Sequence, residues 1–303
     1  MNRRRFIALS AAATATTAVG APEDPKEITF AVLTDVQYAD IPPEGERHYR
    51  ESIPKLKAAV AEIAKAKPAF TLHLGDCIDR NFASYATVLP LFEPLGQPVR
   101  HLLGNHDYTV ADAEKAKVPA TLGMPNDHYA FRSNGLRMVM LDTTELAPYK
   151  HPAGSPEEKA ATEALKRLAA TGAANAQPWC GGISKTQLDW LERELAAADA
   201  AGERAIVCGH HPLLPADGHE IWNAAEVIAA LERHPCVIAW FNGHNHAGAE
   251  AVRKGIPYLT FKSILHEPGK TAYALVTVKP DKLEIAGTGR EKSRSYPLLQ
   301  RKP

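Results

Sequence analysis

The sequence lacks an excess of charge of either sign. Its 303 residues include 35 Lys and Arg against 35 Asp and Glu, so no field of one sign argues for binding to nucleic acid or to an acidic membrane surface. Cysteine is also scarce. The four cysteines show no close pairing, and Cys77, Cys208 and Cys236 lie in or beside apolar runs. Buried free thiols are therefore expected rather than a disulfide framework.

The sequence also lacks a long apolar run. The stretch from Ile7 to Ala21 is too short and too polar for a permanent membrane anchor. It follows a basic start, 2–7, that resembles a twin-arginine export signal, in which two arginines precede a variable residue and an apolar pair. We therefore expect residues 1–21 to engage the twin-arginine export machinery and the protein to be periplasmic or extracellular. The alternative is a disordered basic tail.

Residues 22–303 contain no internal repeat and no Pro/Ser-rich linker, which predicts a single domain. Apolar runs and helical periodicity alternate in the first half and predict a largely parallel, covered sheet. The strand-rich end predicts a second sheet packed on the first. The expected strands are 28–33, 70–75, 99–103, 128–132, 136–141, 204–208, 237–241, 256–261, 272–278 and 282–287. The expected helices are 47–66, 83–95, 157–170, one beginning at Ser184 and 222–233.

Ligand-type side chains follow five of the predicted strands. In an α/β sheet, sites form outside the carboxyl ends of the strands. Each residue alone could be a cap or a turn residue, but together they predict a metal site. They are Asp35 with Gln37, Asp76, Asn105 with His106, His210, and His244 with His246.

These stretches share a pattern with a known superfamily. Asp-x-Gln at 35–37, Gly-Asp-x-x-Asp at 75–79, Gly-Asn-His-Asp at 104–107, Gly-His-His-Pro at 209–212 and Gly-His-Asn-His at 243–246 resemble the motif series of the calcineurin-like metallophosphoesterases. Within that superfamily the sequence is most similar to the manganese-dependent ADP-ribose/CDP-alcohol diphosphatases, at 35–40, 48–50, 181–191 and 222–223. Gln37 stands where most relatives have His. The resemblance implies an α/β fold, a four-layer α/β/β/α sandwich of two mixed sheets.

The resemblance also implies two divalent metal ions that share one carboxylate. One ion would be held by Asp35, Gln37, Asp76 and His246, and the other by Asp76, Asn105, His210 and His244. The motif order favours His210 over its neighbour His211 as the ligand. A water between the ions would attack phosphorus. The oxygen-rich ligand set favours manganese, with iron, magnesium and zinc as alternatives.

His106 is implied to be the general acid rather than a ligand, and Asp79 its orienting carboxylate. Asp79 could instead cap a helix. Arg80 resembles the phosphate-binding arginine of phosphoprotein phosphatases. Tyr38 and Arg50 could contact the distal phosphate or the leaving group, although a solvated face is an equal alternative for Arg50.

The Ala/Pro/Gly-rich segment 143–183 is too long for a plain connection and is predicted to be an insertion over the site. Together with the Trp222 loop it would wall the leaving-group pocket, where Tyr149, Trp179 and Trp222 could stack a nucleobase or simply pack. The expected function is hydrolysis of phosphoanhydride or phosphodiester bonds in small-molecule nucleoside diphosphate derivatives, such as ADP-ribose or CDP-alcohols. The alternatives are a broad exported phosphodiesterase or phosphomonoesterase and a non-catalytic metal- or phosphate-binding module.

Overall fold

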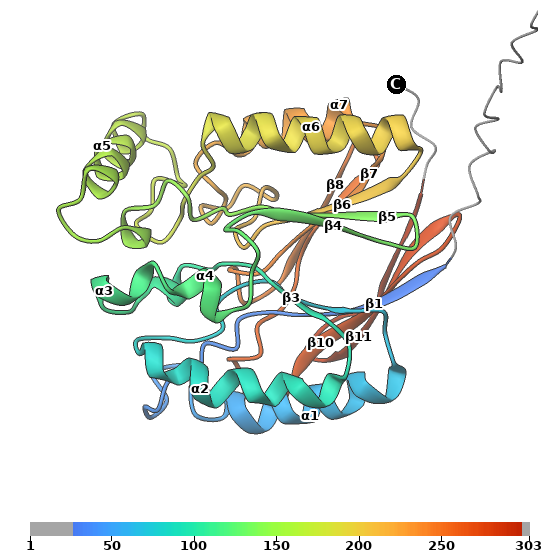
Figure 1. Ribbon diagram of the computed structural model, residues 1–303, viewed down its shortest axis with the longest axis horizontal. Coiled ribbons are helices and arrows are strands. Elements are labelled where there is room, and N and C mark those ends of the chain that lie inside the picture. The colour runs from blue at the N-terminus through green and yellow to red at the C-terminus, as the bar shows by residue number, and fades with distance from the viewer. Residues whose placement is uncertain (1–26, 299–303) are drawn as a thin grey trace, which may run out of the picture.

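Two six-stranded sheets lie face to face, with helices on their outer surfaces (Figure 1). This architecture is seen in a computed structural model that describes residues 27–298. The export signal expected at residues 1–21 lies outside the described residues. Within the described range, no helix has both the length and the apolar character needed to cross a membrane.

The first sheet has the strand order β12-β11-β10-β1-β2-β3. Its parallel part is β1 (Ile28–Leu33), β2 (Thr71–His73) and β3 (Val99–His101). The antiparallel part is β10 (Ala272–Val278), β11 (Lys282–Gly289) and β12 (Arg294–Pro297). The helix α1 (Ser52–Ala66) covers this sheet and buries its apolar stripe of Leu56, Ala59, Val60 and Ile63.

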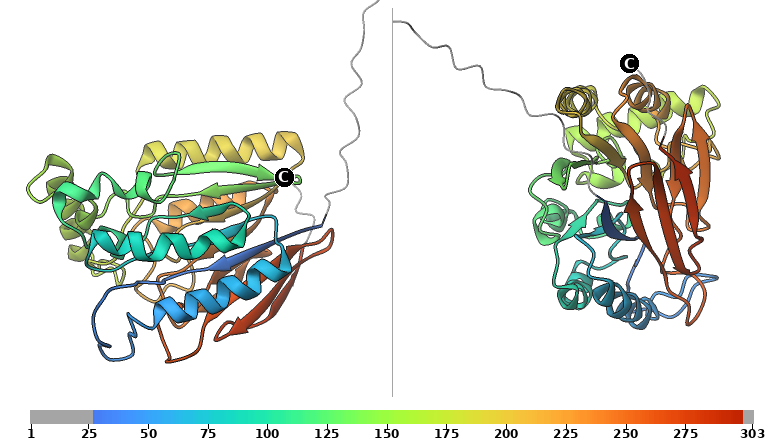
Figure 2. Two further views of the ribbon diagram at one scale, coloured as in Figure 1. Left: turned by 60° about the horizontal axis from the view of Figure 1, so that its bottom comes forward. Right: turned by 90° about the vertical axis from the view of Figure 1, so that its right-hand side faces the viewer.

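The second sheet has the order β4-β5-β6-β7-β9-β8. Four parallel strands form its centre, and an antiparallel strand lies at each edge. The strands are β4 (Tyr129–Ser133), β5 (Leu136–Met140), β6 (Arg204–Cys208), β7 (Val237–Asn242), β8 (Ala249–Arg253) and β9 (Ile256–Thr260). The helices α6 (Lys185–Ala201) and α7 (Ala224–Arg233) cover its outer face, opposite α1 (Figure 2).

The main core lies between the two sheets. Phe30 of the first sheet packs against Phe241 of the second, with ring centroids 6.3 Å apart, and Leu72 and Ile206 belong to the same buried cluster. All four cysteines are buried free thiols. The predicted α/β fold of two mixed sheets is confirmed. Because the inner faces of both sheets are buried against each other, the loops that follow their strands are held in fixed positions relative to one another.

Some predictions about the sheets and helices were wrong. The strand-rich end does not form the second sheet as a unit. The predicted strand at 256–261 joins the second sheet as β9, but β10 pairs antiparallel with the free edge of β1, with Val278 opposite Ile28. An apolar pattern predicts a strand but not the edge that satisfies its backbone hydrogen bonds. Residues 83–95 are not one α-helix either. They form η1 (Phe82–Ser84), α2 (Tyr85–Val88) and the 3₁₀-helix η2 (Leu89–Leu95), because Pro90 and Pro94 remove backbone donors.

The helix predicted at 47–66 begins at Ser52 instead. Residues 44–48 form a loop in which Glu44 pairs with Arg47, and Arg47 pairs with His266, through isolated antiparallel bridges. The segment 143–183 contains η4 (Pro148–Lys150) and α5 (Pro156–Ala170), and α5 lies beyond one end of the two sheets (Figure 1). The remaining short helices are η3 (His106–Tyr108), α3 (Asp112–Lys115) and α4 (Val118–Thr121).

Candidate metal centre and active site

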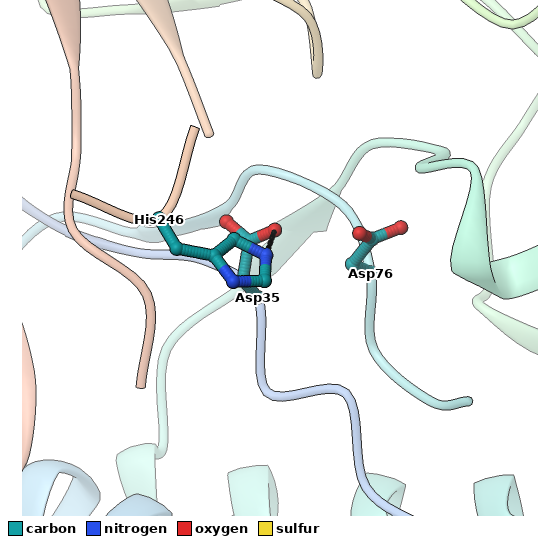
Figure 3. A group of neighbouring side chains, drawn as sticks. All are labelled: Asp35, Asp76 and His246. Atoms are coloured by element: carbon teal, nitrogen blue, oxygen red, sulfur yellow. Dashed lines mark ion pairs between the residues drawn. The ribbon is translucent and has the colours of Figure 1, made fainter. Parts of the chain in front are cut away.

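The ligand-type residues predicted from the sequence converge where the parallel strands of both sheets end. Asp35 follows β1, Asp76 follows β2 and His246 lies in the loop after β7. One ligand atom of each lies within 4.8 Å of the others (Figure 3). His246 Nε2 is 3.4 Å from Asp35 Oδ1. Two carboxylates and an imidazole at this spacing can hold a metal ion.

The backbone is unusual at four of the seven predicted ligands. Asp35, Gln37, Asp76 and His244 have φ values of 51°, 42°, 57° and 67°. Positive φ is uncommon outside glycine and concentrates at functional sites. Backbone hydrogen bonds hold the first two loops in this shape, from Asp35 N to Gly75 O at 3.1 Å and from Gln37 N to Asp76 O at 2.9 Å. The loops after β1 and β2 therefore form one hydrogen-bonded unit.

Asp76 lies at the centre of the group. Its Oδ1 accepts a hydrogen bond from His106 N at 2.8 Å, and its Oδ2 accepts one from Gln37 Nε2 at 2.8 Å. His210 Nε2 lies 3.2 Å from the same Oδ2. A Cβ at position 104 would lie 2.1 Å from Asp76 Oδ1, so Gly104 is the residue that lets the β3 loop approach the carboxylate.

The second sheet presents histidines with fixed orientations. His210 Nδ1 contacts Leu74 O at 2.8 Å, which directs Nε2 toward Asp76 and toward Asn105 Oδ1 at 3.2 Å. His244 Nδ1 lies 3.0 Å from the same Asn105 oxygen. The backbone N–H groups of His210 and His211 both donate to the Thr143 hydroxyl at the end of β5, at 3.1 and 3.2 Å. The ring of His210 is therefore oriented by a backbone carbonyl outside the cluster, and the ring of His244 by Asn105, itself a predicted ligand.

The electrostatics of the group favour cations next to its carboxylates. Burial alone would raise the pKa of Asp35, but the hydrogen bond and charge of His246 lower it below its usual range. Burial opposes the charge on His210, yet Asp76 raises the pKa of His210 to about 9. Burial and the neighbouring His211 lower the pKa of His244 well below its usual value, so this ring is neutral and can donate a lone pair.

The side chains fit a pair of metal ions. Among residues 27–298, Gln37 Oε1 and His244 Nε2 are buried polar atoms without a hydrogen-bond partner, and such atoms call for an explanation. Both belong to the predicted ligands, one from each of the two sets that share Asp76. Two carboxylates, two amides and three imidazoles supply enough oxygen and nitrogen donors for both ions.

His106 and Asp79 form a second functional pair beside Asp76. His106 Nδ1 is 3.1 Å from Asp79 Oδ1, and the Thr109 hydroxyl donates to the same oxygen at 3.0 Å. Burial raises the pKa of Asp79, but its contacts with His106 and Thr109 outweigh burial and lower it. The helix-cap alternative for Asp79 is not what the structure shows, because Asn81 caps η1 instead. Asp79 can therefore orient the imidazole of His106.

A cleft of about 560 Å³ opens onto this group. Asp76, Asn105, His106, His244 and His246 line it, together with Arg47, Trp179, His219 and His266. A larger hollow of about 1020 Å³ lies between β4 and α6 and is lined by none of the predicted site residues. The predicted metal ligands and His106 therefore lie at the smaller cleft.

The predicted substrate residues are not brought into the cleft. Tyr38 packs against the main core, and Arg50 pairs with Asp40 at 2.6 Å on the surface. Arg80 pairs with Glu44 at 2.5 Å. Trp222 lines a separate cavity of about 350 Å³. The Tyr149 hydroxyl lies 3.4 Å from His211 Nε2, so of the three candidate stacking rings only Trp179 lines the cleft.

Sequence reasoning missed Asp107, which holds the site together. Its Oδ2 accepts from Gly104 N and Asp76 N, both at 2.9 Å, and its Oδ1 accepts from Cys77 N at 3.0 Å and the Tyr85 hydroxyl at 2.9 Å. Asp107 is the last residue of the Gly-Asn-His-Asp motif, so the motif itself could have identified it as part of the site. The cleft residues Arg47, His219 and His266 were missed because they lie outside the quoted motifs.

Comparison with known proteins agrees with this geometry. Residues 28–248 match the family model described as calcineurin-like phosphoesterase. The chain belongs to this family, as its motifs predicted, and is a phosphoesterase by class.

Two relatives cover nearly the whole chain. A protein of Xenopus tropicalis is 30% identical over 318 residues, covering 88% of this chain and 93% of that protein. A protein of Oryza sativa subsp. japonica is 31% identical over 296 residues, covering 86% and 91%. Both are named manganese-dependent ADP-ribose/CDP-alcohol diphosphatase. The solved structure of a dimetal phosphatase from Danio rerio superposes with a TM-score of 0.81 at 24% identity, covering 90% of this chain and 99% of that one, which shows the shared fold.

Proposed function

We propose that this protein is a two-metal hydrolase that cleaves the phosphoanhydride bond of nucleoside diphosphate derivatives, such as ADP-ribose or CDP-alcohols. The observation that carries the proposal is the convergence of six further ligand-type side chains around Asp76, next to His106 in one cleft. The names of the two relatives support the substrate class. A module that only binds metal or phosphate would not need His106 and its orienting carboxylate.

We assign one metal ion to Asp35, Gln37, Asp76 and His246 and the other to Asp76, Asn105, His210 and His244. When bound, the ions offset charge on the phosphate oxygens and lower the pKa of a water. The amide and carboxylate oxygens of the set favour manganese, with iron, magnesium and zinc as alternatives. The names of the relatives support manganese.

The residues of the chain then carry out an ordinary hydrolysis. Water adds to one phosphorus atom, the bond from that phosphorus to the bridging oxygen breaks, and two phosphomonoesters form. His106 gives a proton to the departing oxygen, and the proton lost by the attacking water restores the balance. Asp79 holds the imidazole in position through the 3.1 Å contact at Nδ1, which leaves Nε2 as the atom for the transfer.

A substrate panel with the purified, manganese-loaded protein tests the proposal. We expect release of AMP from ADP-ribose and of CMP from CDP-choline or CDP-glycerol. p-Nitrophenyl phosphate and its bis-ester report on the alternatives, a phosphomonoesterase or a broad phosphodiesterase. If the protein hydrolyses either chromogenic ester well and every nucleoside diphosphate derivative poorly, the proposed substrate class is wrong.

The protein is further proposed to act outside the cytoplasm. The support is in the sequence alone, in Arg3-Arg4 followed by Arg5, Phe6 and Ile7. Replacing Arg3 and Arg4 together by lysine should leave the full-length precursor in the cytoplasmic fraction of an expressing bacterium. An exported, shortened product from the double variant would contradict the proposal.

A further inference from the structure

Two histidines line the cleft without belonging to any of the motifs, His219 and His266. The side chain of His219 contacts Asp217, with Nδ1 3.2 Å from Oδ1, and its ring only packs against that of His244, with centroids 5.7 Å apart. His266 differs, because its Nε2 lies 2.7 Å from Nδ1 of the predicted ligand His246. The two rings meet at 75° with centroids 4.8 Å apart. His266 is therefore the histidine that can act on a ligand.

The contacts of His246 fix which of its nitrogens carries the proton. Its Nε2 lies 3.4 Å from Asp35 Oδ1 (Figure 3) and 2.9 Å from Gln37 Nε2, so this nitrogen faces the other ligands. A nitrogen that binds a metal ion needs its lone pair, so the proton of the neutral ring lies on Nδ1. That N–H donates to His266 Nε2, which places the proton of His266 on its own Nδ1. This second N–H faces Glu46 Oε2 at 3.5 Å.

Both nitrogens of His266 are used in this arrangement. Its Nε2 accepts from His246 and its Nδ1 faces Glu46, so neither is left to bind an ion or a phosphate in the cleft. Glu46 is almost fully exposed, and a contact of this kind contributes little. The hydrogen bond between the two imidazoles is therefore the one with consequences for the site.

The backbone of His266 is tied to the loop that carries Asp35. His266 lies in segment 261–271, which runs from β9 of the second sheet to β10 of the first. Leu265 N donates to Asp35 O at 3.2 Å. From α1, the buried Lys55 Nζ donates to the carbonyls of Leu265 and His266, at 2.8 and 3.2 Å. The acceptor for His246 therefore starts from a backbone that is fixed relative to another ligand of the same ion.

We infer that His266 is a positioning residue that fixes the orientation and the tautomer of His246. It thereby sets the affinity of the metal ion that we assign to the set containing His246 and Asp35. The second nitrogen of a ligating histidine usually donates to a carboxylate, a carbonyl or water, and losing that partner costs about 10- to 100-fold in metal affinity or activity. Here the partner is a second imidazole. This inference rests on the metal assignment in the proposed function.

Manganese binding to metal-free protein tests this role without turnover. The electron paramagnetic resonance signal of free Mn²⁺ reports binding in wild type, His266→Phe, His266→Gln and His219→Phe. His266→Phe keeps a ring but removes the acceptor, so one of the two binding events should weaken about 10- to 100-fold while the other stays at the wild-type affinity. His266→Gln should recover most of the loss, because its amide oxygen can accept from His246. His219→Phe, the matched control in the same cleft, should bind both ions as wild type does.

Three outcomes would overturn the role of His266. They are an unchanged affinity in His266→Phe, equal losses in His266→Phe and His266→Gln, and an equal weakening in His219→Phe. Wild-type protein that binds fewer than two manganese ions would instead refute the two-metal site of the proposed function, so the two failures are distinguishable.

A second measurement needs only one substitution, which serves for assignment. Zinc is diamagnetic, so long-range ¹H–¹⁵N spectra of the zinc-loaded wild-type protein can show which ring nitrogens carry protons. The signals of His266 are identified by their loss in His266→Gln. We expect the proton of His266 on Nδ1 and a bare, hydrogen-bonded Nε2. A proton on His266 Nε2 would overturn the inference, because that nitrogen could not accept from His246.

Discussion

The two sheets contribute different chemistry to the same site. The loops of the first sheet bring Asp35, Gln37, Asp76 and Asn105, and so all of the oxygen donors and all of the negative charge. They also bring His106. The second sheet brings only imidazoles, from His210, His244 and His246. Neither sheet forms a complete site by itself, because each proposed metal ion takes oxygen ligands from the first sheet and imidazole ligands from the second.

The loops of the two sheets are also anchored differently. In the first sheet the buried carboxylate of Asp107 accepts four hydrogen bonds and ties the loops after β2 and β3 together. In the second sheet a neutral hydroxyl, that of Thr143, accepts from two backbone N–H groups. The first-sheet loops therefore depend on charged carboxylates twice, as metal ligands and, at Asp107, as the anchor of the loops. Substitutions of these carboxylates are expected to have the largest effects.

The largest effect is expected from Asp76→Asn. Asp76 is shared by both proposed ion sites, and losing even an outer partner of a metal ligand costs about 10- to 100-fold in affinity or activity. Turnover should fall beyond that range, and metal analysis should show both ions lost. His246→Ala, on the second sheet, should lose one of the two. Full turnover by Asp76→Asn would contradict the shared-carboxylate arrangement.

His106→Ala should lower kcat by about 10²-fold, because a positioned general acid contributes at least that much. Metal content should stay at the wild-type level, since His106 is not one of the proposed ligands. Turnover and metal analysis on the same preparation separate this residue from the three histidines of the second sheet. If His106→Ala turned over as fast as wild type, its acid role would be refuted.

Asp107→Asn should destabilise the first-sheet half. One carboxylate oxygen becomes an NH₂ group, so two buried donors lose their acceptor at about 1–3 kcal/mol each. We expect the free energy of unfolding in urea to fall by about 2–6 kcal/mol. Tyr85→Phe, which removes a single donor to Asp107, serves as the control and should cost less. Equal stability of Asp107→Asn and wild type would show that the carboxylate is not the anchor.

A smaller effect is expected from the pH dependence of His101. Burial lowers the pKa of His101 to about 4, and its Nδ1 lies 3.3 Å from His73 Nδ1 beneath the first-sheet loops. The unfolded chain takes up a proton near its ordinary pKa of about 6.5, while the folded chain does so only near 4. Stability is therefore complete above that ordinary pKa and falls at up to about 1.4 kcal/mol per pH unit as the pH drops toward 4.

His101→Gln removes this titration. Urea unfolding at a series of pH values should show a shallower decline for the variant than for wild type between pH about 6.5 and 4. Identical slopes would mean that His101 takes up a proton in the folded protein as readily as in the unfolded chain.

Much of the site could be predicted because each residue directly follows an apolar run. Asp35, Asp76 and His210 lie just beyond the ends of β1, β2 and β6, where the buried apolar run stops. The other residues that line the cleft could not be found in the same way. Arg50 is paired with Asp40, whereas Arg47 faces the cleft because the 44–48 loop pairs with His266, which is 219 residues away in the chain.

The sequence by itself determined most of the strands and long helices, the family and the residues at the strand ends, because these depend on local patterns and on short motifs. Only the tertiary structure decided that the last three strands extend the first sheet, that Asp107 anchors the loops, and that Arg47 and Trp179 rather than Arg80 and Trp222 line the cleft. The physical reason is that edge pairing and ion pairing join segments far apart in the chain. Their energies depend on which partners the packed sheets bring within reach.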